Sequence, residues 1–498
     1  MILSFRRAAC LAAAALLCLS VLGGCAGDGQ PTSAPGQPAA SGTTGAAPAD
    51  SPLNDGRLRV FQNSVLFRGS ECLLTAPASG SVWLLEDSTD ESSVYAVLAQ
   101  PQGSDAYVYS VLDASGSTVF DCGTQQPRSL HGGWMLLVPG ERDTGTDGTA
   151  RLVKLETGEV RQAPAGASYF FAAGDHYVLN CETAFDPDGL YHCDVVVLDS
   201  TMQESARFTD SFANSSPEDG SPWVAVYPLY SDGTASGGAW LSNAQTGERV
   251  GYDTGSFSSF CSGSIAQMRP EGENGPYRLL DLNTGETLAE YDAQCDLYLG
   301  GAALLWNIDG SDFNYLLCRA DGSTVPAYTF DQSAGRVLVL LADSVECYDE
   351  TGALIFSQPL DASALAYEGD WVSYSITDLG GTQFLLSVYS GESRCTIYGP
   401  DGPVVDLAGY DGVYHPEGTS YLLASRQGQG SVWLCDVLAM DGTPLVTGVV
   451  QSYGTLIGDV VPVRRGFAEG WIDLSGNWLW QRSIWQSAND EGTAYFYG

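Results

Sequence analysis

Lysine is almost missing from this chain, because among its 498 residues Lys154 is the only one. Lysine and arginine together number 21 against 60 aspartates and glutamates, which gives a formal net charge of −39 at pH 7. Binding to nucleic acid or to anionic lipid headgroups requires clustered basic side chains that neutralise phosphates. We therefore expect no nucleic-acid partner, whereas neutral or basic partners are compatible with this charge.

Recognisable catalytic and metal-binding motifs are also missing. The four histidines, His131, His176, His192 and His415, are far apart in sequence, and no zinc-protease, nucleophile-elbow, Walker or dinucleotide-binding motif is present. The segment 143–148 lacks the carboxylate spacing of a calcium loop. We predict no catalytic residue, no metal and no cofactor. An enzymatic alternative stays open, because sequence alone does not identify a catalytic carboxylate pair among 60 acidic residues.

The cysteines show no Cys-x-x-Cys pair, which argues against a zinc ribbon or a thioredoxin-type site. Cys10 and Cys18 lie in the N-terminal leader and Cys25 directly follows it, while the other ten are scattered, many of them in apolar segments. Cys181 and Cys193 flank a turn segment at 186–189, so we predict a candidate disulfide across a hairpin. The alternative reading uses His192 with nearby aspartates as metal ligands.

The first 24 residues read as a signal peptide. Arg6 and Arg7 precede an apolar run that ends in Leu22-Gly23-Gly24-Cys25. This resembles the lipobox of bacterial lipoproteins, which implies cleavage before Cys25 and a lipid on that cysteine; an ordinary secretory signal or an uncleaved anchor helix is the alternative. Residues 25–56 are mainly Ala, Gly, Ser, Thr, Pro and Gln, the composition of a flexible linker. We expect a lipid-anchored protein on the extracytoplasmic face of a bacterial membrane.

The remainder, residues 57–498, is built from variants of one hairpin. In its clearest form an apolar strand over 277–282 leads into Asn283-Thr284-Gly285, where Gly285 takes a positive φ, and a second strand returns over 287–291. Similar turns from an Asp, Asn or Glu to a Gly recur, mostly roughly 30 to 50 residues apart, in the range of propeller-blade repeats. They lie at 113–116, 156–158, 243–247, 321–322, 349–352, 401–402, 441–442 and 473–476. The sequence predicts an all-β protein.

The motif Asp281-Leu-Asn-Thr-Gly-Glu286 resembles the blade hairpin of PQQ-like and YVTN-type β-propeller repeats. A second segment, Gly470 to Trp478, is similar to a WG-type repeat with its Gly and Trp in reversed order. Together these likenesses imply a β-propeller of about 7–8 four-stranded blades over 57–498. The segment 58–67 is expected to pair with the C-terminal segment and close the ring.

Trp478, Trp480 and Trp485 crowd near the C-terminus and are the candidate binding residues, since exposed aromatic rings stack on sugars or anchor proteins. We expect a non-catalytic binding or scaffold protein for a protein or a cell-envelope glycan. The alternative is an enzyme with its site in the propeller funnel, either a carbohydrate-active hydrolase or a quinone-dependent dehydrogenase.

Overall fold

The computed structural model describes residues 52–103, 106–140, 149–185, 191–216, 220–229, 238–252, 254, 256–262, 264–269, 275–306, 313–333, 335–367, 371–416, 418–428, 433–451, 458–466 and 468–483. All described residues belong to one unit, Gly42–Gly498. Within those ranges no helix has the length and apolarity needed to cross a membrane. The expected leader, Cys25 and most of the expected linker lie outside the described residues.

The described elements are one 3-10 helix and 41 strands. The helix η1 covers Pro52–Asp55, so the folded part begins before residue 57. Three strands follow it as a small antiparallel sheet: β1 (Leu58–Phe61), β2 (Val65–Arg68) and β3 (Glu71–Thr75). All other described strands form four-stranded antiparallel meanders, which confirms the all-β propeller class predicted from the sequence.

The first half of the chain supplies five meanders, whose strands have the following bounds. They are β4 (Ser81–Asp87), β5 (Asp90–Gln102), β6 (Ala106–Leu112) and β7 (Thr118–Gly123); β8 (Gln126–His131), β9 (Trp134–Val138), β10 (Arg151–Lys154) and β11 (Glu159–Gln162); β12 (Ala167–Ala173), β13 (His176–Phe185), β14 (Tyr191–Leu198) and β15 (Glu204–Phe208); β16 (Ser211–Ser215), β17 (Trp223–Pro228), β18 (Trp240–Asn243) and β19 (Arg249–Val250); and β20 (Phe257–Ser262), β21 (Ile265–Met268), β22 (Tyr277–Asp281) and β23 (Thr287–Tyr291).

The second half supplies five more, in which two long strands are each shared by successive meanders. The bounds are β24 (Cys295–Leu299), β25 (Ala302–Trp306), β26 (Tyr315–Cys318) and β27 (Thr324–Ser333); β27 again with β28 (Arg336–Leu341), β29 (Ser344–Asp349) and β30 (Leu354–Pro359); β31 (Ser373–Gly380), β32 (Gln383–Tyr389), β33 (Ser393–Gly399) and β34 (Gly402–Asp406); β35 (Gly412–Tyr414), β36 (Tyr421–Gln427), β37 (Trp433–Ala439) and β38 (Pro444–Gln451); and β38 again with β39 (Val460–Arg465), β40 (Ala468–Asp473) and β41 (Trp478–Ser483).

The hairpin predicted at 277–291 is confirmed, since β22 and β23 pair in antiparallel register around Gly285 at φ +74°. One oxygen of Asp281 accepts the Asn283 N–H at 2.8 Å, which holds the turn closed. The same arrangement joins the third and fourth strands of other meanders. At Asp349, for example, one oxygen accepts the N–H groups of Thr351 and Ala353.

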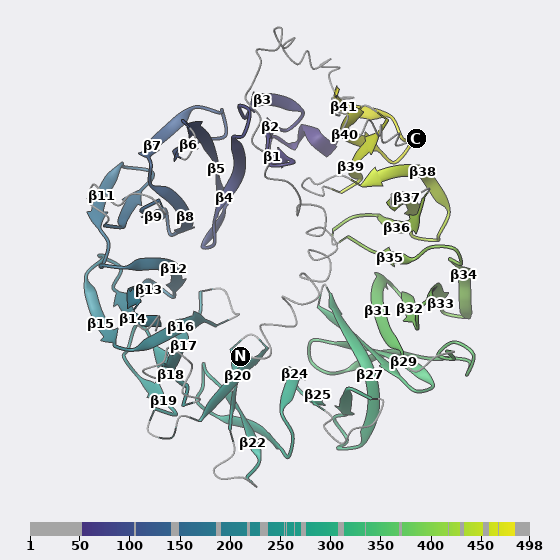
Figure 1. Cartoon of the computed structure of the whole chain (residues 1–498). Coiled ribbons are helices and arrows are strands. Elements are labelled where there is room, and N and C mark those ends of the chain that lie inside the picture. Colours follow the sequence, from purple (N-terminus) through teal and green to yellow (C-terminus); the bar gives the residue numbers. More distant parts are fainter. Residues whose placement is uncertain are drawn as a thin grey trace. The chain divides into compact units, whose positions relative to one another are not determined.

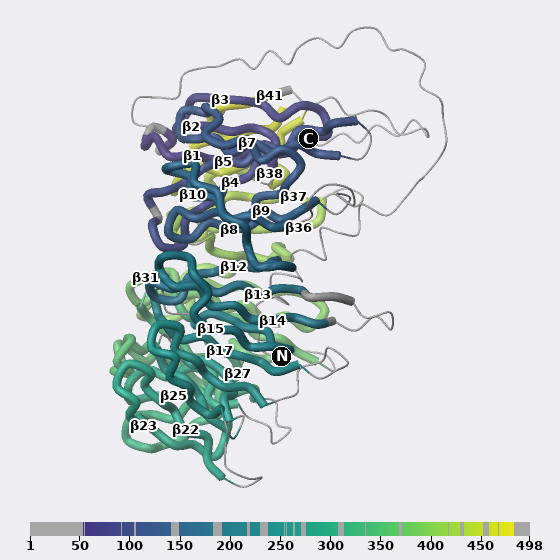
Figure 2. Tube along the Cα trace, turned by 90° about the vertical axis from the view of Figure 1, so that its left-hand side faces the viewer, coloured from purple at the N-terminus to yellow at the C-terminus, as the bar shows by residue number. Residues whose placement is uncertain are grey.

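Apolar clusters between neighbouring meanders hold the sheets in a circle. Phe170 and Leu136 belong to the cluster between β8–β11 and β12–β15, and equivalent clusters follow at every later junction. β1–β3 contacts both β4–β7 and β39–β41 through two further clusters. Figure 1 shows this order, and both Figure 1 and Figure 2 place the purple β1–β3 beside the yellow β41.

Closure of the circle differs from the expectation. The segment 58–67 is not one strand paired with the C-terminus; it is the hairpin β1–β2, which turns at Gln62 and Asn63 with φ of 48° and 49°. Its side chains pack on β40 and β41 without sharing a sheet with them. The described residues make eight hydrogen-bonded sheets, in which the large ones combine two meanders each, so ten meanders and β1–β3 line the circle.

Candidate binding cleft

The two ends of the meanders carry different exposed side chains. In a four-stranded meander, the connection between the second and third strands and the connection to the next meander lie at one end, here called the loop end. The turns between the first and second and between the third and fourth strands lie at the other, here called the turn end. Both definitions follow from the antiparallel strand order.

Exposed aromatic residues gather at the loop end, whereas exposed aliphatic residues lie on fourth strands near the turn end. The aromatic residues at the loop end are Tyr107, Tyr169, Tyr252, Tyr367, Trp371, Tyr389 and Trp433, and Tyr414 lies on the first strand β35. The aliphatic residues are Val119, Val160, Leu288, Leu354, Ile355, Val404 and Leu445. The loop end is therefore the side on which ring stacking is available to a ligand.

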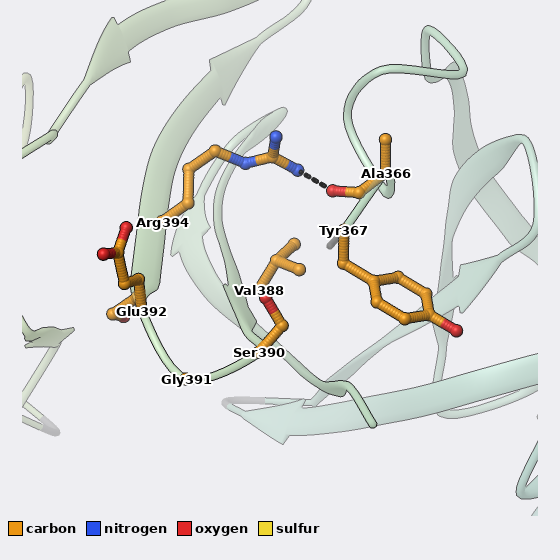
Figure 3. Close-up of a pocket in the computed structure, with 8 residues that line it drawn as sticks. Ala366, Tyr367, Val388, Ser390, Gly391, Glu392 and Arg394 are labelled. Carbon is orange, nitrogen blue, oxygen red and sulfur yellow. Dashed lines mark hydrogen bonds between the residues drawn. The ribbon is translucent and has the colours of Figure 1, made fainter. Parts of the chain in front are cut away.

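An open cleft of about 740 Å³ lies at the loop end of the β31–β34 meander. One wall is the β30–β31 connection with Ala366 and Tyr367, and the other is the β32–β33 hairpin from Val388 to Arg394 (Figure 3). The lining residues are Ala366, Tyr367, Val388, Ser390, Gly391, Glu392, Ser393 and Arg394. The cleft thus combines apolar and ring surface with one carboxylate, one guanidinium and two serine hydroxyls.

Arg394 fixes the two walls relative to each other. It pairs with Val388 across the β32–β33 ladder, and its Nη2 donates to the carbonyl oxygens of Ala364 at 2.5 Å and Ala366 at 3.1 Å. The hydroxyl of Tyr374 donates to the carbonyl oxygen of Leu365 at 3.1 Å. These bonds from strand residues hold the 364–366 backbone against the sheet. Both walls of the cleft are therefore in place before a ligand binds.

The rim of the cleft carries a ring pair. The rings of Trp371 and Tyr389 meet edge to face, with centroids 5.2 Å apart, and the two residues are 56% and 43% exposed. Tyr389 and Val388 are consecutive on β32, so their side chains leave opposite faces of the sheet and the ring pair flanks the hairpin instead of lining the cleft. A ligand that spans the hairpin therefore contacts both surfaces.

A second set of polar contacts joins β27 to β31. An oxygen of Asp331 accepts the backbone N–H of Asp378 at 3.0 Å, while the Asp378 carboxylate accepts from Ser333 at 3.3 Å and lies 3.4 Å from the Arg336 Nε. Burial raises the pKa of Asp331, and the nearby Asp378 charge adds to that rise against the hydrogen bonds that lower it. The carboxylate of Asp378 also accepts the Gly380 N–H, so its oxygens already have partners within the protein. We interpret these contacts as a structural link between the two sheets.

The structure brings the two predicted cysteines to neighbouring strands but not into a disulfide. Cys181 stands opposite Asp194 and Cys193 opposite Glu182, so the two side chains leave the β13–β14 ladder on opposite faces. Both side chains are buried. The aspartates at 186 and 188 lie outside the described residues, and among the described ones no group of three His, Cys, Asp or Glu side chains is arranged to hold a metal.

The predicted tryptophans do not form an exposed cluster. Trp480 is 8% exposed and packs in the core that closes the circle, and Trp478 is partly buried with the Arg465 guanidinium 6.0 Å from its ring. Trp485, like Cys25, lies outside the described residues.

The sequence analysis did not identify Tyr367, Tyr389 and Arg394 as residues of the cleft and its rim. Its one available signal was Trp371, which follows a polar Glu-Gly-Asp segment and lies ahead of β31.

Comparison with known proteins gives a family. A family described as "Domain of unknown function (DUF5046)" matches residues 241–491, which include the cleft. No curated protein sequence matches the chain.

Among solved structures, BamB from Moraxella catarrhalis is 13% identical with a TM-score of 0.28, over 69% of this chain and 92% of that one. The dihydro-heme d1 dehydrogenase NirN in complex with DHE is 14% identical with a TM-score of 0.30, over 72% and 73%. The β-propeller domain of the Trilobed protease from Pyrococcus furiosus is 9% identical with a TM-score of 0.24, over 55% and 94%. These neighbours are propellers, and at such scores they carry no argument about activity.

Proposed function

The chain belongs to the DUF5046 family, and from its own surface we propose that it is a non-catalytic propeller that binds a glycan of the cell envelope at the loop end of the β31–β34 meander. The single observation that carries this proposal is the exposed Trp371–Tyr389 ring pair beside a preformed cleft. A large exposed aromatic surface next to a concave polar site is a common feature of binding sites.

The chemistry of the cleft suits a neutral sugar chain. Sugar rings present C–H faces that stack on aromatic rings and hydroxyls that need both donors and acceptors. Tyr367 provides ring surface, Glu392 accepts hydrogen bonds, and Ser390 both donates and accepts. With a net charge of −39, the protein repels a polyanionic chain at long range, so a neutral glycan fits better than an acidic one.

A lipid on Cys25 would place this site just outside a bacterial membrane. The proposal depends on the signal-like segment 1–24 and the linker-like composition of 25–56. As a flexible coil, such a linker spans about 30 Å, from 5–6 Å times the square root of its length. Metabolic labelling with a fatty-acid analogue is expected to mark the wild-type chain and not the Cys25→Ala variant.

The binding proposal is tested with the purified chain on immobilised cell-envelope polysaccharides, read out by titration calorimetry with the best-bound soluble fragment. Trp371→Ala and Tyr389→Ala are each expected to weaken binding by about tenfold or more, the effect of removing an aromatic hot spot. The matched control is Tyr169→Ala, which removes a ring that is 51% exposed on a different meander and is expected to leave affinity unchanged.

Three results would count against this function. An equal loss of glycan affinity in the Tyr169→Ala variant would show that the ring pair is not the binding site. Hydrolysis of the bound polysaccharide would show that the protein is an enzyme and would favour the hydrolase alternative. If no polysaccharide binds while crosslinking recovers one protein through the loop end, the ligand is a protein and the glycan proposal is wrong.

A further inference from the structure

We propose that Cys261 and Cys295 are a disulfide-forming pair, which joins the β20–β23 meander covalently to the β24–β27 meander. The bond forms by exchange with a small disulfide such as oxidised glutathione. This proposal is independent of the proposed glycan binding, because neither cysteine lines the cleft.

The two cysteines lie side by side although they stand 34 positions apart in sequence. The Cys261 thiol donates to the Cys295 carbonyl oxygen at 3.5 Å, and both residues pack in one apolar cluster. Cys261 is on β20 and Cys295 is the first residue of β24, so the contact bridges the first strands of two neighbouring meanders. A disulfide joins cysteines whose Cα atoms are about 4.4–6.8 Å apart, so a thiol that touches its partner's backbone is a starting point for such a bond.

A buried glutamine fixes the contact. Gln267 on β21 is fully buried, its Oε1 accepts the Cys295 N–H at 2.5 Å, and its Nε2 donates to the Ser259 hydroxyl at 3.3 Å. Ser259 lies two residues before Cys261 on the same strand. The start of β24 is therefore held against β20 by polar bonds as well as by the shared apolar cluster, which keeps the two cysteines next to each other.

The cysteine pair on the β13–β14 hairpin is arranged differently. Cys181 and Cys193 leave their ladder on opposite faces. Cys318 packs in the same cluster as the pair, and burial raises its pKa. Cys318 is thus a matched reference thiol in the same surroundings.

The exchange has a defined order. Cys295 is 1% exposed and hydrogen-bonded through its thiol to the Leu297 carbonyl oxygen at 3.2 Å, whereas Cys261 is half-buried and can meet a small oxidant. The Cys261 thiolate attacks one sulfur of oxidised glutathione and expels one glutathione thiolate, which leaves a mixed disulfide. The Cys295 thiolate then attacks the Cys261 sulfur and expels the second glutathione. Two protein thiols are oxidised, one glutathione disulfide is reduced to two thiols, and the two thiol protons pass to the glutathione thiolates.

The test uses the full-length chain, first reduced and then equilibrated with oxidised glutathione. Remaining thiols are alkylated and peptides are mapped by mass spectrometry without reduction. The expected result is one linked peptide pair containing Cys261 and Cys295, with Cys318 alkylated in full. The apparent melting temperature is expected to rise by roughly a few degrees on oxidation, as for a bond that closes a loop of this size.

Variants separate this pair from its neighbours. Cys318→Ser is expected to retain the linked peptide, and Cys261→Ser is expected to lose it and to leave Cys295 reduced. The proposal is overturned if oxidised wild-type chain links Cys318 to either residue, or if Cys261 and Cys295 are both alkylated after equilibration. The wild-type mapping decides the matter even where a variant fails to fold.

Discussion

At the scale of single residues, Asp87 shows how one buried carboxylate joins two meanders. It ends β4 and is 3% exposed, and β4 meets β8 there through a single parallel bridge to Leu130. One oxygen accepts the N–H groups of Thr89 and Gly132, both at 2.9 Å, and the other accepts the Gly133 N–H at 2.5 Å. Burial by itself would raise the pKa of Asp87, but these hydrogen bonds outweigh burial and hold the pKa below its ordinary value.

We expect Asp87→Asn to be costly because it turns an acceptor into a donor. The asparagine amide has one oxygen and one NH2 group. The N–H of Gly132 or Gly133 would therefore face another donor. The free energy of unfolding should fall by about 2–3 kcal/mol, the range for a broken hydrogen bond to a charged group. The measurement is the urea midpoint.

Asp90→Asn is the matched control for this substitution. Asp90 is fully exposed and its oxygens accept from Ser92 and Ser93, so the same chemical change there should move the midpoint little. Equal shifts in the two variants would mean that Asp87 is not a junction between the meanders.

At the scale of elements, the turns between third and fourth strands repeat one device. Asp113, Asp199, Asp349 and Asp473 each accept two backbone N–H groups at positions two and four residues later through one oxygen. The hydroxyl of Thr351 and these backbone donors lower the pKa of Asp349 below its ordinary value. Asn243 occupies the equivalent position in another turn and accepts N–H groups with its amide oxygen.

The natural Asn243 suggests a test of the pH dependence of these turns. Because the pKa of Asp349 is lower in the folded than in the unfolded chain, its contribution to stability is complete above the unfolded value. It is lost as pH falls through the folded value. Asp349→Asn should therefore be less stable than wild type at pH 7, and the difference in melting temperature should shrink as the pH falls below the ordinary carboxyl pKa.

The reverse substitution supplies the control. Asn243→Asp should gain stability at neutral pH relative to acid pH, opposite in sign to Asp349→Asn. A difference between wild type and Asp349→Asn that stays constant from pH 7 to pH 3 would contradict a role for the ionised carboxylate.

Elements of this kind were predictable because their signals are local. An Asp or Asn followed by a positive-φ glycine between two apolar runs needs no knowledge of the rest of the chain, and the hairpin over 277–291 was located correctly on that basis. The cleft was not predictable, because Arg394 meets Ala366 only after a 28-residue excursion through the meander. Trp480 was misjudged for the same reason, since its neighbours come from β1 and β2 at the far end of the described chain.

At the scale of the whole folded unit, the circle of sheets depends on its closure. Each meander buries its faces against two neighbours, so β1–β3 and β39–β41 would each leave one apolar face in water if they separated. The contact between them is a four-ring cluster of Phe61, Phe67, Trp471 and Trp480, supported by Leu53 from η1. Arg482 adds a hydrogen bond from β41 to the side chain of Gln62 at 3.3 Å.

Trp471 is the central member of this cluster, and its removal should open the circle. It is completely buried, with ring centroids 4.5 Å from Phe67, 5.4 Å from Phe61 and 5.9 Å from Trp480. Trp471→Ala should lower the free energy of unfolding by about 3–5 kcal/mol, the range for a large buried aromatic residue replaced by alanine. The readout is the urea midpoint, together with protease cleavage near residue 75.

Trp471→Phe separates packing from hydrogen bonding at this closure. The indole N–H of Trp471 has no hydrogen-bond partner among the described residues, so phenylalanine removes a buried unsatisfied donor while it keeps much of the ring contact. The loss of unfolding free energy in Trp471→Phe should be well below that in Trp471→Ala.

Trp371→Ala is the control for a tryptophan outside the cluster. Because Trp371 is 56% exposed, its replacement should change the free energy of unfolding by less than about 0.5 kcal/mol. If Trp471→Ala melts like Trp371→Ala, the aromatic cluster does not hold the circle closed, and the closing interaction must lie in the polar contacts of β41.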